Sequence, residues 1–259
     1  MIRTKNLFIL LIVFFIGITN VLAQGFSHEI GVIAGPVAFY SDYGIRNDME
    51  TNTGNMGLGV GIVHYISFAY RADCNCYTQD TYFNDHFKIR NELDYHVTNL
   101  DHHGIWAESE GFGGEQLRAM HGKATVTEIG THLEYFPLSI RDFSAFAYKV
   151  APYVSLGVHY VHYSPTGYSD LGSLTEPGSP AIFPAFEDGI VLDSGNTWAI
   201  AGSVGMRYKL SVLSDLLIDA RWHWYDSDWV DGLNHDQPQN QANDWMFWIN
   251  VGYIYYLDF

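Results

Sequence analysis

The sequence predicts an all-β protein: one eight-stranded antiparallel barrel that crosses a membrane and has a closed lumen filled by side chains. Two observations lead to this fold class. Every odd position from Trp245 to Phe259 is large and apolar, and a strict period of two over that length indicates a strand that can cross a bilayer at a tilt. In addition, 16% of the residues are aromatic and only 16% are charged, which suits a barrel with aromatic girdles at both membrane interfaces.

The start of the chain predicts a secretory signal peptide over residues 1–23. Basic residues precede an apolar run over residues 7–18, and Ala23 ends a small-x-Ala cleavage pattern. We therefore expect a cleaved signal peptide and one outer-membrane barrel domain over residues 24–259, with an uncleaved anchor as the less favoured alternative. No later run reaches the length of about 18 apolar residues that a spanning helix needs.

The charge balance excludes one class of partner. The formal net charge is −16, whereas binding to nucleic acid needs a basic face against the phosphates. We therefore expect no nucleic acid partner.

Four strands are expected in the first half of the barrel, and each is indicated by alternation. In residues 26–40 apolar side chains alternate with small or polar ones. In residues 57–68 three glycines share one face, which leaves room for bulky side chains across the lumen. Residues 87–98 give the clearest internal pattern, with charged positions against apolar ones, and residues 125–136 place Glu128 and Glu134 on one face.

The other four strands are expected at residues 148–163, 197–210, 216–225 and 245–259. In residues 197–210 large apolar side chains alternate with small or basic ones. Long connections should follow strands 1, 3, 5 and 7 outside the cell, and short turns should follow strands 4 and 6 in the periplasm. The long connections are Ser41–Met56, Asn99–Ala124, Ser164–Asn196 and Asp226–Asp244, and the short ones are Pro137–Ala147 and Ser211–Asp215.

Charged residues on the strands are expected to point into the lumen. An eight-stranded barrel leaves interior space only for side chains, so an ion-pair lattice is favoured over a polar conduit or a ligand site. The members of this lattice are Lys88, Arg90, Glu92, Asp94, Glu128, Glu134, Arg207, Asp219 and Arg221.

No residue pattern predicts catalysis, so we expect a protein that is not an enzyme, with no catalytic residues, cofactor or metal. Nucleotide-binding, zinc-protease and serine-hydrolase motifs are missing from the sequence. Cys74 and Cys76 favour a strained bridge or two free thiols over a metal site. Asp101, His102, His103 and His121 are more often solvated than metal-bound, and a lipid-modifying site built from Asp101, His102 and Ser109 is a weaker alternative.

Several stretches resemble the PorG-like outer-membrane barrels of the type IX secretion system and related flavobacterial barrels, which are of the OmpA/OmpX size class. They are residues 26–35, 127–142, 148–154, 203–210 and 243–248. The end of the chain also resembles the last strand of bacterial outer-membrane barrels. This resemblance implies an assembly signal at Tyr253, Tyr255 and Phe259, and contacts with outer-membrane lipids and with the barrel assembly machinery. The PorG-like resemblance implies an anchor for the periplasmic ring of the secretion and gliding machinery, whose subunit would be a PorK-like lipoprotein.

The periplasmic turn Ala69–His86 departs from the barrel pattern and is the expected partner site. It has 18 residues, whereas a hairpin connection needs about 2 to 5. A plug or a self-packed loop is an equal alternative. A general outer-membrane or adhesion barrel acting through acidic external loops is the alternative function. The expected contact residues are Arg71, Cys74, Cys76, Tyr77, Tyr82, Phe83 and Arg141.

Overall fold

A computed structural model describes residues 26–45, 48–52, 54–68, 82–176, 178–235 and 242–257. The expected signal peptide lies outside these residues, as do Arg71, Cys74, Cys76, Tyr77 and Phe259. The strands are β1 (Ser27–Tyr40), β2 (Met56–Ser67), β3 (Phe87–Asp101), β4 (Met120–Tyr135), β5 (Val150–Tyr163), β6 (Thr166–Ser169), β7 (Gly195–Ser211), β8 (Ser214–Tyr225) and β9 (Trp245–Leu257). The helical pieces are α2 (Met49–Asn52), α3 (Tyr82–His86), α4 (Phe112–Ala119), α5 (Ile140–Ser144) and the 3-10 turn η1 (Pro184–Phe186).

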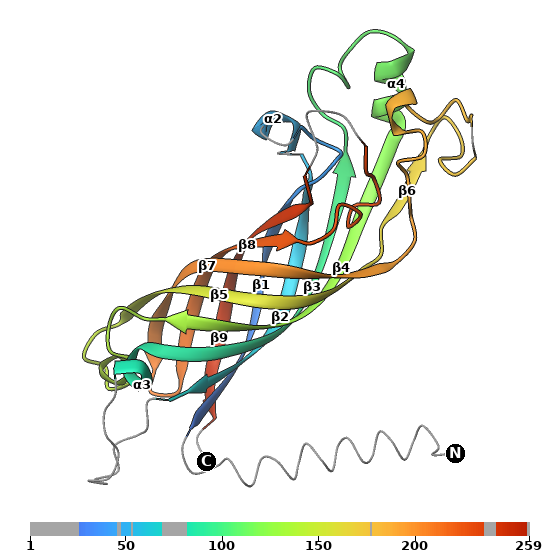
Figure 1. The fold of residues 1–259 in the computed structure, drawn as a ribbon. Helices are drawn as coiled ribbons and strands as arrows, with labels where there is room; N and C mark the ends of the chain where they lie inside the picture. Colours follow the sequence, from blue (N-terminus) through green and yellow to red (C-terminus); the bar gives the residue numbers. More distant parts are fainter. Residues whose placement is uncertain are drawn as a thin grey trace, which may run out of the picture.

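Eight of these strands close into a barrel. Each pairs antiparallel with its neighbours in the order β3-β2-β1-β9-β8-β7-β5-β4, and a further β3–β4 pairing closes the ring. The short strand β6 pairs only with the start of β4 and stands outside the ring. The expected eight-stranded antiparallel barrel is therefore confirmed (Figure 1).

The wall formed by β3 and β4 is longer than the sequence pattern indicated. Pairing continues to Asp101 opposite His121, whereas the expected strands ended at Thr98 and began at Thr125. At this end of the strands the outward-facing positions are polar and not apolar. The alternation of apolar and polar residues that predicts a membrane strand is therefore absent from the sequence here. The connection expected over residues 99–124 is accordingly shorter and contains α4, and β6 lies within the expected loop 164–196.

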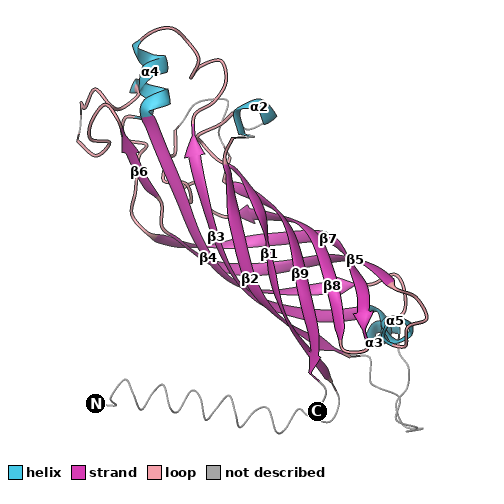
Figure 2. Ribbon diagram, turned by 180° about the vertical axis from the view of Figure 1, so that it is seen from behind, coloured by secondary structure: helices cyan, strands magenta, loops and turns pink. Residues whose placement is uncertain are grey.

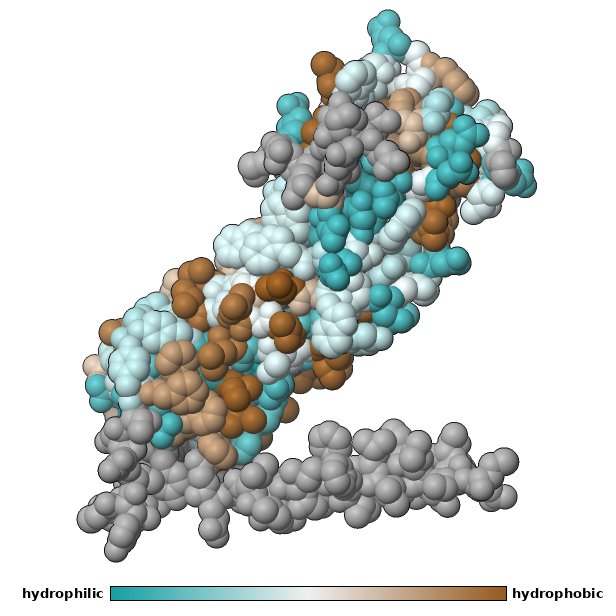
Figure 3. Space-filling model, in the orientation of Figure 1, coloured by the Kyte–Doolittle hydropathy of each residue, from teal (hydrophilic) through white to brown (hydrophobic). Residues whose placement is uncertain are grey.

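The faces of the barrel are inverted relative to a water-soluble protein. On β9, Ile249 and Val251 are 46% and 55% exposed, whereas Trp248 and Asn250, which alternate with them, are fully buried. Apolar residues gather over the barrel wall towards the end that carries α3, while the opposite end is mostly hydrophilic (Figure 3). A closed barrel with this outward apolar band satisfies its backbone polar groups within lipid.

The two ends of the barrel differ. β1 begins and β9 ends beside α3 and α5, and the long loops with α2 and α4 lie at the other end (Figures 1 and 2). With the first strand starting in the periplasm, the long loops are extracellular. Within the described ranges, no helix is long and apolar enough to cross a membrane.

Candidate functional site

The lumen is the part of the barrel where charged side chains converge. All nine residues expected in the ion-pair lattice are at most 3% exposed. Two neighbours outside that set, Glu29 and Asp215, are equally buried. Buried charges without partners are costly in a low dielectric. The pairing of these side chains therefore determines whether a closed, side-chain-filled lumen is stable.

Near the periplasmic end, one carboxylate serves two cations. Glu29 on β1 forms ion pairs with both Lys88 and Arg207. Both cations were expected to pair with the lattice carboxylates Glu92, Asp94, Glu128, Glu134 and Asp219. For Lys88 this prediction is wrong, because its partner Glu29 lies outside that set. Pairing across a lumen depends on strand register and tilt, which alternation along one strand does not report.

In the middle of the lumen two arginines share four carboxylates. The Arg90 guanidinium lies 2.8 Å from Glu134 and 3.0 Å from Glu92. Arg221 lies 2.7 Å from Asp219 and 2.8 Å from Glu92. A fourth carboxylate, that of Asp94, lies 3.4 Å from Arg221. This network joins side chains of β3, β4 and β8.

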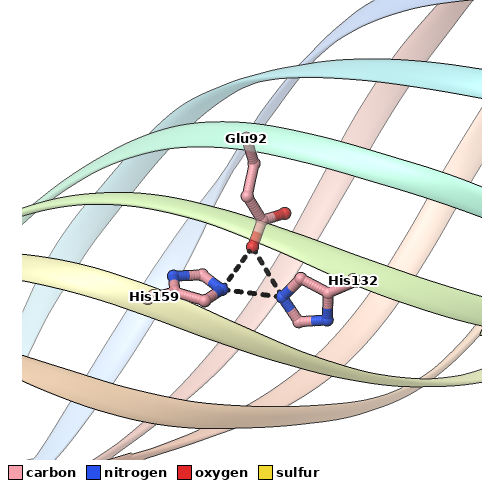
Figure 4. A group of neighbouring side chains, drawn as sticks. All are labelled: Glu92, His132 and His159. Carbon is pink, nitrogen blue, oxygen red and sulfur yellow. Dashed lines mark hydrogen bonds and ion pairs between the residues drawn. The ribbon is translucent and has the colours of Figure 1, made fainter.

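Above the arginines, histidines gather around two glutamates. Nε2 of His132 and Nε2 of His159 lie 2.9 and 3.0 Å from Oε1 of Glu92, and 2.7 Å from each other (Figure 4). On the other side of His159, Nδ1 lies 2.7 Å from Glu128. Glu128 also accepts a hydrogen bond from the Tyr225 hydroxyl at 2.7 Å and contacts His223 at 2.9 Å.

Two groups of potential metal ligands result. One is Glu92, His132 and His159, and the other is His96, Glu128 and His223. His132 and His96 share a strand face with the predicted lattice residues Glu134 and Glu92, whereas His159 and His223 were missed. Both missed residues stand on the same face of their strands as buried neighbours, Tyr153 on β5 and Arg221 on β8, so extending the alternation along each strand would have found them.

The packed lumen predicts that the barrel does not conduct ions. Charged pairs occupy its middle, and the fully buried Trp248 and Phe39 lie on inward faces nearer the extracellular end. We expect planar-bilayer recordings of the purified protein to show no steady single-channel conductance. A reproducible conductance step would contradict the plugged interior.

Three buried aspartates hold the extracellular loops together. Asp231 accepts hydrogen bonds from the backbone N–H groups of Asp42 and Leu233, both at 2.8 Å. Asp244 accepts from the N–H of Val230 at 3.0 Å. Burial, together with nearby carboxylates, raises the pKa of Asp231 to about 7 and the pKa of Asp244 above its usual range.

The raised pKa of Asp231 predicts a loop cluster that loosens as pH rises. The neutral acid is favoured in the fold, so its contribution is complete below the unfolded value near 3.8 and is lost as pH rises towards 7. We expect amide hydrogen exchange at Leu233, corrected for its intrinsic rate, to show less protection at pH 8 than at pH 5. Asp231→Asn should reduce this difference; equal protection at both pH values would contradict it.

A cavity of about 250 Å³ opens among the same loops. Its lining includes Tyr43, His102, Trp106 and Phe186. His102 stacks between Tyr43 and Phe186, with ring centroids 4.7 and 5.3 Å away, and burial lowers its pKa to about 3. His102 is therefore a neutral wall of an aromatic pocket.

The loop residues considered for metal binding or lipid modification have separate partners. Asp101 pairs with His121, whereas Ser109 donates a hydrogen bond to the carbonyl of Trp106. His102 is held by its aromatic neighbours. In the part of the chain that the structure describes, the groups with metal-ligand proximity lie in the lumen and not in these loops.

At the periplasmic rim, α3 and α5 lie side by side. The Asp85 carboxylate accepts hydrogen bonds from the Ser139 hydroxyl at 3.0 Å and from the Arg141 backbone N–H at 3.1 Å. Tyr82 and Phe83 on α3 are 62% and 45% exposed. Three of the expected contact residues, Tyr82, Phe83 and Arg141, therefore share this rim.

The expected assembly signal is described only in part. Tyr253 and Tyr255 point outward from β9 and are 45% and 43% exposed. Outward aromatics near a strand end suit an interfacial girdle.

A closed barrel with an apolar outer face, a charged interior and long loops at one end is an outer-membrane β-barrel. Similar solved structures include Neisserial surface protein A (12% identity, 90% of this chain and 99% of that chain covered, TM-score 0.44). Others are a major outer membrane protein from Thermus thermophilus (14%, 89% and 99%, 0.45) and OprG from Pseudomonas aeruginosa (16%, 88% and 96%, 0.43).

These likenesses are distant. No protein-family model matches the sequence, and no curated protein is significantly similar to it. Because the TM-scores are low, the class rests on the inverted faces of this barrel.

Proposed function

We propose that this protein is a non-enzymatic anchor in the outer membrane, which binds a periplasmic partner at the rim formed by α3 and α5. Following the PorG-like sequence resemblance, the proposed partner is a PorK-like lipoprotein of the type IX secretion ring. The observation that carries the proposal is a fixed, exposed aromatic surface at the periplasmic end.

The rim has the properties of a binding surface. Asp85 ties α3 to α5, so the short helices are held without a partner. Around this tie, Tyr82, Phe83, Leu138 and Phe146 are each at least 40% exposed. Aromatic side chains held in place before binding cost little ordering entropy and are enriched at interface centres.

Part of this aromatic surface also belongs to the barrel wall. The Tyr82 hydroxyl lies 2.6 Å from that of Tyr135, and Phe83 stacks on Phe87 with centroids 4.8 Å apart. An interfacial girdle needs such residues too, so the test must separate binding from folding.

A double variant, Tyr82→Ser with Phe83→Ser, is expected to fold and to lose co-purification of the periplasmic lipoprotein. The matched control, Trp106→Ser with Tyr168→Ser, removes two aromatics that are each 63% exposed at the extracellular end and should retain it. Both proteins should keep the heat-modifiable band of a folded barrel. Retained co-purification in the rim variant would move the site elsewhere.

Deletion of the gene tests the secretion role directly. If the protein is a component of the secretion machinery, its deletion should abolish export of type IX cargo. An unimpaired set of secreted proteins would instead favour a surface barrel acting through its external loops. The aromatic cavity beside His102 is the observation that favours this second function.

A further inference from the structure

We propose that Glu92, His132 and His159 form a binding site for one divalent transition-metal ion inside the lumen. This site is independent of the proposed anchoring role. The three residues come from neighbouring strands β3, β4 and β5 and are at most 3% exposed. Their donor atoms point towards one another (Figure 4).

Hydrogen bonds alone do not satisfy this triangle of atoms. Its edges are 2.7, 2.9 and 3.0 Å. A carboxylate oxygen carries no hydrogen and each Nε2 carries at most one, so at most two edges can be hydrogen bonds. The third edge is a close contact between polar atoms without a shared hydrogen, which is costly in a buried setting.

A metal ion resolves this conflict with suitable geometry. Ligand bonds of about 2.0 to 2.1 Å place neighbouring ligands of an octahedral ion about 2.9 Å apart. The three edges match one face of such an ion. Two histidines and one carboxylate on a single face are a known donor set for first-row divalent metals.

The surroundings orient both histidines for this role. Nδ1 of His159 faces Glu128 at 2.7 Å, and Nδ1 of His132 lies 3.1 Å from the Ser155 hydroxyl. If each Nδ1 carries the hydrogen, each Nε2 presents its lone pair to the centre, as metal-bound histidines do.

Two glycines make room for the rings. Gly130 stands opposite His159, and Gly157 stands opposite His132. A Cβ atom at Gly130 would lie 2.4 Å from the His159 ring, and one at Gly157 would lie 2.5 Å from the His132 ring. The histidine positions thus depend on these two small residues.

The charge of the lumen leaves a place for a divalent cation. The strands bury seven carboxylates, against five lysine and arginine side chains. The nearest cation to the site is Arg221, 2.8 Å from Oε1 of Glu92, and Asp219 neutralises it at 2.7 Å. Glu92 also pairs with Arg90 through Oε2. The carboxylates are Glu29, Glu92, Asp94, Glu128, Glu134, Asp215 and Asp219, and the cations are Lys88, Arg90, Arg207, Lys209 and Arg221.

Co²⁺ is the probe that tests the site, because its visible absorption reports the ligands. The purified protein is unfolded in urea with chelator and refolded in detergent with Co²⁺. We expect about one equivalent to remain after gel filtration, with histidine-type absorption bands. Refolded wild-type protein without bound Co²⁺ or such bands would overturn the proposal.

Variants locate the ion. His132→Gln and His159→Gln should lower bound Co²⁺ at least tenfold, whereas His96→Gln, an equally buried lumen histidine outside the triad, should retain it. Equal binding by His132→Gln, or loss in His96→Gln alone, would overturn the assignment. Gly157→Ala keeps every charged group but displaces the His132 ring, so it should also lose the bound Co²⁺. If His132→Gln does not fold, as shown by loss of its heat-modifiable band, Gly157→Ala tests the site in its place.

Discussion

Glu29→Gln is expected to destabilise the folded barrel by about 3–5 kcal/mol, because it leaves two buried cations without their shared counter-charge. Lys88 and Arg207 both pair with this carboxylate, which is only 3% exposed. The loss should appear as a lower urea midpoint for refolding into lipid vesicles, read from the heat-modifiable band.

Two further variants test whether the loss of stability comes from the unpaired buried cations. Glu187→Gln removes one carboxylate from an exposed loop position and should change stability by no more than about 0.5 kcal/mol. Adding Lys88→Met to Glu29→Gln should recover part of the loss, because one unpaired cation is removed. A double variant as unstable as the sum of both single variants would argue against charge pairing as the reason.

Trp248→Ala is expected to cost about 3–5 kcal/mol through the cavity that it leaves. The indole is fully buried, donates a hydrogen bond to the Gly35 carbonyl at 3.2 Å and meets the His96 ring edge-on at 4.5 Å. Urea unfolding in the same vesicles measures the change.

An exposed tryptophan is the control for the buried Trp248. Trp106 is 63% exposed in an extracellular loop, and Trp106→Ala should shift stability by no more than about 0.5 kcal/mol. Equal costs for the two alanine variants would show that the interior is not closely packed around Trp248.

Alternation along single strands predicted most of the fold, because membrane and lumen impose opposite polarity on successive residues. The facing of Ile249 and of Glu92 follows directly from this period. What it does not contain is the pairing between strands that are distant in sequence. Glu29 became the partner of Lys88, and His159 met Glu92, only through the register and curvature of the closed ring.

The extracellular wall shows another limit. Residues 99–101 and 120–124 form strand beyond the apolar band. The outer face of the barrel is in contact with water there, so polar and apolar residues need not alternate along the strand. The rim helices escaped prediction for a different reason: α3 and α5 are too short for a helical period, and a side-chain tie through Asp85 holds them.

The long β3–β4 wall makes the extracellular end of the barrel asymmetric. β4 continues from its last pairing with β5, at Val126, back to Met120. At about 3.3 Å per residue this is a rise of roughly 20 Å along the strand. In the described part of the chain, β6 and α4 lie on this same tall side (Figure 1). A large molecule that approaches the extracellular end from this side would therefore contact α4 and the β3–β4 hairpin before it reaches the barrel wall below them.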